Sequence, residues 1–224
     1  MSWRDIDLNR LFTLDMDPKL SCGKTSYDSA VLFMMMAEGL HYKSFLELGT
    51  SAGYVSMLMG RYFELKGGGL VHTCDPKRLE GNTINEEKWK NAEVRYFEMT
   101  SDDYFAQLDD GVKFDMVFID GCRYPDFLIR DTENSLKHLS KFGTLVYHDL
   151  ITLPTVTHFL YKVLPTMGEF EVVRWPFCTG VAIVRRSERE DWLGITKEVY
   201  PDHGYVMDKV WVDLKEVISR YGGE

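Results

Sequence analysis

The chain has 224 residues, and 45% of them are hydrophobic, which is enough to build one sizeable core. Its 26 basic and 35 acidic side chains give a formal net charge of −9, and no long run of lysine or arginine occurs. Affinity for nucleic acid rests largely on neutralising phosphates, so this balance argues against a DNA or RNA partner.

Cysteine use and hydropathy bear on the compartment. The four cysteines, Cys22, Cys74, Cys122 and Cys178, are far apart, form no C-x-x-C pair and lack zinc-ligand spacing. The sequence shows no secretory signal and no long apolar span. We therefore expect a cytoplasmic protein without membrane attachment.

The first 25 residues are polar and irregular, and we expect them to form an N-terminal extension. Residues 26–42 are apolar enough for a packed helix. From residue 44, short apolar runs alternate with stretches of helical character such as 53–66 and 124–141. This alternation predicts a parallel sheet with helices on both faces. The five runs expected as strands are 44–49, 70–75, 93–99, 114–120 and 144–149.

A pair of strand-like runs follows a helical stretch at 153–164. These runs, 170–177 and 180–186, are joined only by Cys178 and Thr179, which predicts an antiparallel hairpin at one edge of the sheet. For residues 26–186 we therefore expect an α/β fold, Rossmann-like and doubly wound, with a mostly parallel seven-stranded sheet. Residues 187–224 are expected to be a C-terminal helical extension that packs on the domain or on a second subunit of a homodimer.

The expected strands end in acidic and histidine side chains. Glu47 ends the first strand, Asp75 the second and Asp120 the fourth, and His148 with Asp149 ends the fifth. In an open parallel sheet, ligands bind beyond the carboxyl ends of the strands. The sequence therefore predicts a ligand site at this edge of the sheet.

The turn after the first strand, GTSAG at 49–53, indicates which ligand. A dinucleotide-binding turn has glycine at its middle position, where this chain has Ser51, and Glu47 would repel a phosphate. S-adenosylmethionine fits better, because it carries ammonium and sulfonium cations and a ribose diol but no phosphate. The helix expected to start near Ala52 would offer amides to its carboxylate, and Asp75 would accept both ribose hydroxyls.

The stretch FLELGTSAGYVSML resembles the first motif of class I S-adenosylmethionine-dependent methyltransferases, especially the catechol and caffeoyl-coenzyme A type of O-methyltransferases and their relatives acting on sugars and antibiotics. VHTCDP is similar to their ribose-binding motif, and the likeness continues through FDMVFIDGCRYPDFLIRDTENSLKHLSKFGTLVYHDL to cover residues 26–186. It implies S-adenosylmethionine as the cofactor and a small-molecule acceptor, with the adenine at residues 101 and 102. The cofactor-binding residues that the resemblance implies are Glu47, Gly49, Thr50, Ser51, Gly53, Tyr54, Asp75, Ser101, Asp102 and Asp120.

Many of these relatives use a divalent cation to lower the pKa of the acceptor hydroxyl. The positions that match their metal ligands are Asp120, His148 and Asp149. The two aspartates suit magnesium, whereas His148 would favour manganese, iron or zinc. Alternatively, His148 is the general base, because imidazole titrates near neutral pH.

Arg123 and Cys122 depart from the family pattern. Arg123 stands where relatives carry lysine or histidine, and Cys122 stands where an acidic residue is usual. Arginine cannot take a proton, so we expect it to orient an anionic substrate or to pair with Asp126. The catalytic residues expected from the sequence are therefore His148, Asp120 and Arg123.

Four functions stay open at this point, and the last of them, a nucleic-acid methyltransferase, is possible for this fold but conflicts with the net charge. The first is a small-molecule methyltransferase directed to oxygen. The altered residues Cys122 and Arg123 favour a second, a catalytically silent module that binds S-adenosylmethionine. The third is a nicotinamide-dependent oxidoreductase, which Glu47 and Ser51 disfavour.

Overall fold

The computed structural model describes residues 27–79, 82, 84–86, 88–175 and 179–187. Its helices and strands lie in the first of two units, Met1–Arg186 and Ser187–Glu224. The N-terminal extension expected at residues 1–25, the helix expected within the C-terminal extension and any subunit contact made there lie outside the described residues. The domain limits and the homodimer stay predictions.

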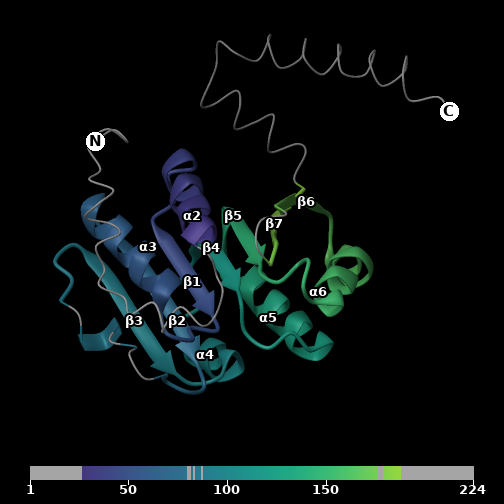
Figure 1. Cartoon of the computed structure of the whole chain (residues 1–224), viewed down its shortest axis with the longest axis horizontal. Helices are drawn as coiled ribbons and strands as arrows, with labels where there is room; N and C mark the ends of the chain where they lie inside the picture. The colour runs from purple at the N-terminus through teal and green to yellow at the C-terminus, as the bar shows by residue number, and fades with distance from the viewer. Residues whose placement is uncertain (1–26, 80–81, 83, 87, 176–178, 188–224) are drawn as a thin grey trace, which may run out of the picture. The chain divides into compact units, whose positions relative to one another are not determined.

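Seven strands form one mixed sheet in the order β3-β2-β1-β4-β5-β7-β6 (Figure 1). Strands β1 to β5 run parallel, and β7 pairs antiparallel with both β5 and β6. The predicted fold class, including the edge hairpin, is confirmed. The strands are β1 (Ser44–Leu48), β2 (Gly69–Asp75), β3 (Ala92–Glu98), β4 (Phe114–Ile119), β5 (Leu139–Tyr147), β6 (Phe170–Trp175) and β7 (Val181–Arg186).

Helices cover both faces of the sheet, because side chains along each strand alternate between faces. Along β4, Met116 and Phe118 join the buried cluster that contains side chains of α2 and α3. Val117 and Ile119 join the other cluster, with side chains of α4, α5 and α6. No helix among the described residues has the length and apolarity to cross a membrane. The helical segments are α2 (Tyr27–Gly39), α3 (Tyr54–Leu65), η3 (Ile84–Glu86), α4 (Ser101–Gln107), α5 (Pro125–Lys137), α6 (Pro154–His158), η4 (Phe159–Val163) and α7 (Leu164–Met167).

Two differences in element boundaries from the sequence prediction stand out. The helix expected to run to residue 141 ends at Lys137, and Leu139 already belongs to β5, where Phe114 of β4 pairs with it before an irregularity in the register. The helix expected at 153–164 consists of α6, the π-helical turn η4 and α7. A regular α-helix cannot continue there, because Pro165 has no amide hydrogen for the carbonyl four residues earlier.

The strand order places the site. From β1 the chain runs outward through β2 to β3, then returns to lay β4 against the other side of β1. At such a switch point the loops after the two neighbouring strands diverge and leave a crevice at the carboxyl edge. The loops after β1 and β4, which carry the predicted ligand-binding residues, therefore flank this crevice.

Candidate functional site

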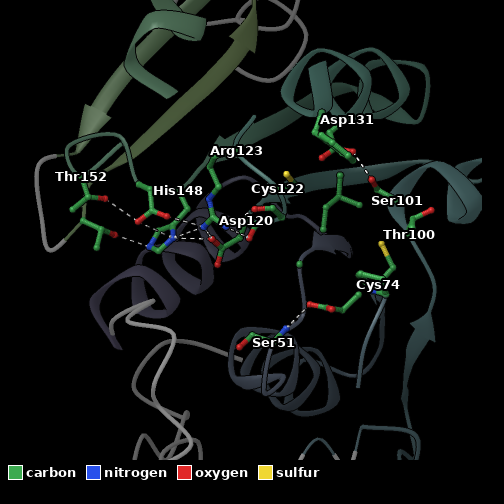
Figure 2. Close-up of a pocket in the computed structure, with 18 residues that line it drawn as sticks. Ser51, Cys74, Thr100, Ser101, Asp120, Cys122, Arg123, Asp131, His148 and Thr152 are labelled. Carbon is green, nitrogen blue, oxygen red and sulfur yellow. Dashed lines mark hydrogen bonds and ion pairs between the residues drawn. The ribbon is translucent and has the colours of Figure 1, made fainter. Parts of the chain in front are cut away.

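A cavity of about 680 Å³ lies at the carboxyl ends of β1, β2, β4 and β5 (Figure 2). It brings together most of the side chains predicted from the strand ends. Those predicted residues that line it are Gly49, Ser51, Asp75, Ser101, Asp120, Arg123, His148 and Asp149. The predicted residues that are not among its lining residues are Glu47, Thr50, Gly53, Tyr54 and Asp102.

The turn after β1 has three residues in the left-handed region, which residues other than glycine rarely adopt. Gly49 has a φ of 98°, and a Cβ atom there would lie 2.5 Å from the carbonyl oxygen of Asp120. Ser51 has a φ of 50° and Gly53 one of 85°, so α3 starts only at Tyr54, later than the predicted start near Ala52. The main chain after β1 can therefore approach the strand ends closely, as the glycines predicted.

Asp75 faces the cavity from the end of β2 with both carboxylate oxygens aligned by main-chain amides. The amide of Ser51 donates to one oxygen at 3.1 Å, and the amide of Lys77 donates to the other at 3.1 Å. Each oxygen has a further lone pair, so the carboxylate can still accept a ligand hydroxyl on each side. This geometry suits a pair of neighbouring hydroxyls.

Glu47 is placed differently from Asp75. Its side chain is buried, and its carboxyl group accepts hydrogen bonds from Ser56 of α3 at 2.5 Å and from Thr73 of β2 at 3.0 Å. Thr73 in turn bonds to Thr50 at 2.6 Å. Burial raises the pKa of Glu47 to about 8, so its carboxyl group is mostly protonated at neutral pH. The hydrogen bonds of Glu47 thus link β1 to β2 and to α3. Its contact with a cofactor stays a prediction.

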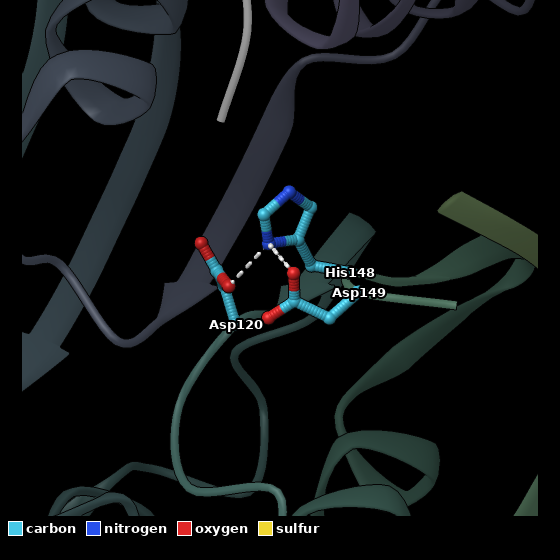
Figure 3. A group of neighbouring side chains, drawn as sticks. All are labelled: Asp120, His148 and Asp149. Atoms are coloured by element: carbon cyan, nitrogen blue, oxygen red, sulfur yellow. Dashed lines mark hydrogen bonds and ion pairs between the residues drawn. The ribbon is translucent and has the colours of Figure 1, made fainter. Parts of the chain in front are cut away.

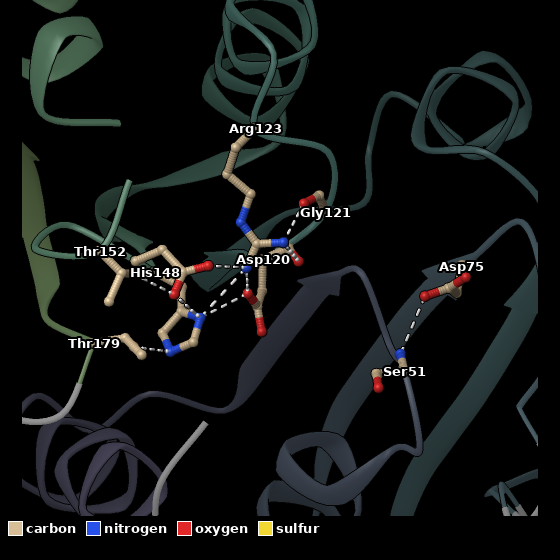
Figure 4. Close-up of polar contacts among 9 residues, drawn as sticks. Ser51, Asp75, Asp120, Gly121, Arg123, His148, Thr152 and Thr179 are labelled. Atoms are coloured by element: carbon tan, nitrogen blue, oxygen red, sulfur yellow. Dashed lines mark hydrogen bonds and ion pairs between the residues drawn. The ribbon is translucent and has the colours of Figure 1, made fainter. Parts of the chain in front are cut away.

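At the other end of the cavity, His148 connects a carboxylate to a hydroxyl (Figure 4). Its Nδ1 lies 2.8 Å from Oδ1 of Asp120, and its Nε2 lies 2.7 Å from Oγ1 of Thr179. A carboxylate only accepts, so Nδ1 carries the hydrogen; in the neutral ring Nε2 then accepts from Thr179. The ring is almost fully buried, which fixes this orientation.

Arg123 does not pair with Asp126, the contact that the sequence suggested. Its Nη2 contacts Oδ1 of Asp120 and lies 2.8 Å from Oδ2 of Asp149, and its Nη1 donates to the main-chain carbonyls of Asp120, at 2.6 Å, and of Gly121. The arginine follows β4 directly and turns back over the strand end, so the strand-end carboxylates are nearer to it than the one on α5.

The candidate metal ligands lie close together (Figure 3). Asp120, His148 and Asp149 each offer one ligand atom, and these atoms all lie within 4.8 Å of one another. However, Nη2 of Arg123 contacts both carboxylates and lies 3.4 Å from Nδ1 of His148. A cation bound to all three ligands would collide with this nitrogen. With Arg123 in this position, the residues do not fit a metal ion.

Among the lining residues that were not predicted as site residues, Asp131 and Thr179 form hydrogen bonds to predicted ones. Asp131 of α5 is buried, accepts a hydrogen bond from Ser101 at 2.5 Å, and has a pKa that burial raises to about 6. The available signal was its helical spacing, because Leu128, Asp131 and Ser135 all lie on the buried face of α5. Thr179 lies in the connection of the edge hairpin, and nothing in its sequence context marked it.

Other residues considered from the sequence lie away from the cavity. Asp102, expected at the adenine, pairs with Arg130 at 3.1 Å on the surface. Tyr124 and Trp175, aromatic residues near the strand ends, are exposed and are not among the lining residues. Phe127 of α5 is the aromatic side chain that lines the cavity.

A family model described as a methyltransferase domain matches residues 46–150. A search of curated proteins found no significant match. The match begins within β1 and extends past the end of β5, so it includes Asp75, Asp120 and His148 but not Thr179.

Solved structures show the same fold at low sequence identity. The SAH-bound methyltransferase PaMTH1 of Podospora anserina has a TM-score of 0.60 at 15% identity, with 77% of this chain and 83% of that chain covered. The O-methyltransferase of Bacillus cereus in complex with SAH also has a TM-score of 0.60, at 17% identity and coverage of 79% and 89%. The SAM complex of the O-methyltransferase TomG of Streptomyces achromogenes, involved in tomaymycin synthesis, has a TM-score of 0.58 at 18% identity, with coverage of 79% and 92%.

Proposed function

We propose that the chain is a class I S-adenosylmethionine-dependent methyltransferase, and that it methylates an oxygen of a small-molecule acceptor with His148 as the base. The observation that carries the proposal is a single cavity with Asp75 at one end and the Asp120–His148–Thr179 chain at the other. Its volume of about 680 Å³ is that of a small-molecule site.

The cofactor end of the cavity takes S-adenosylmethionine in this proposal. The two oxygens of Asp75 accept the ribose hydroxyls, and the adenine lies toward Ser101 and Phe127. The sulfonium then faces Asp120 and Asp149, whose two negative charges exceed the single positive charge of Arg123 between them. The methyl group points to the end of the cavity where His148 lies.

Methyl transfer needs an acceptor oxygen in line with the methyl carbon and a group that takes its proton. The oxygen forms a bond to the methyl carbon while the bond from that carbon to sulfur breaks, and the sulfonium becomes a neutral thioether. His148 takes the acceptor proton at Nε2, where Thr179 now donates. Asp120 keeps Nδ1 protonated and stabilises the imidazolium that forms.

A metal-assisted version of this function would use Asp120, His148 and Asp149 as ligands. The guanidinium of Arg123 contacts the carboxylates of Asp120 and Asp149, so the proposed reaction uses no metal ion. The same contacts favour a second candidate function, a module that binds S-adenosylmethionine without transferring its methyl group, because Arg123 restrains the groups that would do the chemistry.

Calorimetric titration with S-adenosylmethionine, and separately with NAD, tests the cofactor. We expect micromolar affinity for S-adenosylmethionine and no heat with NAD. Transfer of a labelled methyl group to a panel of hydroxyl-bearing small molecules then tests the reaction. Binding without transfer to any acceptor would favour the silent module, and failure to bind S-adenosylmethionine would overturn both candidates.

A further inference from the structure

We propose that the guanidinium of Arg123 is a built-in cation that takes the place of a divalent metal ion between Asp120 and Asp149. This chain then neither binds a metal ion there nor needs one. That no metal ion binds follows from the geometry of four side chains. That none is needed rests on the proposed methyl transfer.

The position of one nitrogen atom carries the proposal. Nη2 of Arg123 contacts Oδ1 of Asp120, lies 2.8 Å from Oδ2 of Asp149 and lies 3.4 Å from Nδ1 of His148. These are side chains that also form the candidate cation cluster, whose ligand atoms lie within 4.8 Å of one another. A positively charged nitrogen therefore sits where a metal ion would have to bind (Figure 4).

The guanidinium is also held from its other side. Nη1 donates to the main-chain carbonyls of Asp120 and Gly121, so each of the two Nη atoms has two acceptors. To admit a metal ion, Arg123 would have to give up these four contacts together. Its Nε is buried and has no hydrogen-bond partner among the described residues, so it offers no exposed donor to a ligand.

The positive charge of Arg123 also disfavours a metal ion at this position. Arginine stays protonated at any physiological pH, so its charge already compensates that of the neighbouring carboxylates. A divalent cation entering beside it would meet a like charge at close range in a largely buried site.

The arrangement also limits the acceptor. A metal ion can hold two acceptor oxygens at once, whereas the Nη hydrogens of Arg123 are committed to protein oxygens. The polar position next to the proposed base is the one that Thr179 occupies at Nε2 of His148. The acceptor class that follows is a molecule bound through one hydroxyl, and a vicinal diol gains nothing from its second oxygen.

The test is a titration of the full chain with Mn²⁺, followed by electron paramagnetic resonance of the free ion, with S-adenosylhomocysteine present and absent. We expect no binding by the natural chain up to millimolar Mn²⁺. In Arg123→Ala the three ligands are released, and we expect one Mn²⁺ per chain with at least tenfold tighter binding. Adding Asp149→Asn to Arg123→Ala should abolish that gain.

Two control variants make the test specific. Arg130→Ala also removes one arginine, but from the surface pair with Asp102, and should gain no Mn²⁺ binding. Arg123→Lys keeps a cation and should also gain none. Thermal melting and S-adenosylhomocysteine affinity show which variants are folded.

Tight binding of one Mn²⁺ by the natural chain, lost in Asp149→Asn, would overturn the proposal. So would a folded Arg123→Ala variant that binds no Mn²⁺. If Arg123→Ala does not fold, the natural chain and Arg123→Lys decide, because binding by either overturns the proposal. None of these Mn²⁺ titrations requires methyl transfer, so their outcome is independent of the proposed function. A failure of the proposed function would instead appear as absent cofactor binding or absent methyl transfer. Once an acceptor is known, unchanged turnover in EDTA supports the statement about need, and loss of turnover overturns it.

Discussion

The two ends of the cavity are built differently. At the end near β2, the carboxylate of Asp75 is aligned by the main-chain amides of Ser51 and Lys77 and faces no opposite charge in these contacts. At the end near β5, Asp120, His148 and their charged neighbours satisfy one another through side chains. The first end is a rigid acceptor surface, and the second is a closed network.

This difference separates affinity from selectivity. A ligand hydroxyl at Asp75 adds a hydrogen bond to a carboxylate that still has capacity, so binding there adds favourable contacts. A ligand at His148 has to replace the hydrogen bond from Thr179. Only an acceptor whose shape brings its hydroxyl to Nε2 can therefore bind productively at that end. We therefore expect substitutions at the first end to change cofactor affinity and substitutions at the second to change turnover.

The largest effect is expected at the closed network. His148→Ala should lower the turnover number by about 10² to 10⁴, the usual contribution of a general base, and leave the affinity for S-adenosylmethionine within about twofold. Steady-state kinetics and calorimetry measure the two quantities. His158→Ala, which removes an exposed histidine of α6, is the matched control. Equal losses of turnover and affinity would contradict the separation of the two ends.

The next largest effect is expected at the end of the cavity near β2, which we call the open end because Asp75 can still accept hydrogen bonds there. Asp75→Asn keeps an oxygen that can accept the amide of Ser51 but removes the charge, so the affinity for S-adenosylhomocysteine should fall at least about tenfold. Calorimetry measures it, with Asp126→Asn on the exposed start of α5 as the control. An affinity unchanged by Asp75→Asn would mean that the ribose does not bind there.

Glu47 tests whether the open end has a charge behind its turn. Burial raises its pKa to about 8, above the ~4.3 of an exposed glutamate. Between these values the folded protein binds more protons than the unfolded chain, so this stabilising contribution is present at low pH and is lost as the pH rises through 8. In Glu47→Gln the fall in unfolding free energy between pH 5 and 8 should be shallower, by up to about 1.4 kcal/mol per pH unit.

Urea unfolding at several pH values measures this slope. Glu133→Gln, an exposed change on α5, should follow the natural chain. Parallel curves for Glu47→Gln and the natural chain would show that Glu47 is ionised in the folded protein. In that case the open end would have the negative charge of an ionised Glu47 beside it, instead of a neutral, protonated carboxyl group.

The smallest effect concerns the backbone. Ser51 and Asp149 have φ values of 50° and 60°, and they belong to opposite ends of the cavity. Ser51→Gly should raise the unfolding free energy by less than about 1 kcal/mol, because relief of the left-handed conformation is partly offset by the entropy of glycine. Asp149→Gly relieves the same strain but removes a partner of Arg123, and should lower it. Thermal melting that ranks the two variants in the reverse order would contradict the comparison.

The sheet and the end of the cavity near β2 could be predicted because local signals and global fold agree there. Short apolar runs separated by turns gave the strands, and the glycines at 49 and 53 marked a turn that the structure places in the left-handed region. Asp75 was identified from its place at a strand end, where the cavity is found. Each of these inferences used residues close together in the sequence.

The rest depends on contacts between distant residues. Thr179 reaches His148 only because β7 folds back beside β5, a pairing that puts residues 31 apart into contact. The turn of Arg123 toward Asp149 depends on which carboxylate is nearest in space, and Asp126 was nearer in sequence. The end of α5 was misplaced because an apolar residue such as Leu139 fits a helix pattern and a strand pattern equally well.

The strand order has one further consequence, for how such an enzyme can evolve. The turn after β1 and the carboxylate of β2 come before residue 108, whereas Asp120, His148 and Thr179 all come after β4 begins at Phe114. The groups named here at the two ends of the cavity are thus encoded by two consecutive stretches of the gene, whereas Asp131, which bonds to Ser101, comes from the second stretch. A single recombination between α4 and β4 would exchange Asp120, His148 and Thr179 together and keep the turn after β1 and Asp75, so a new acceptor end could be acquired without rebuilding these parts of the proposed cofactor site.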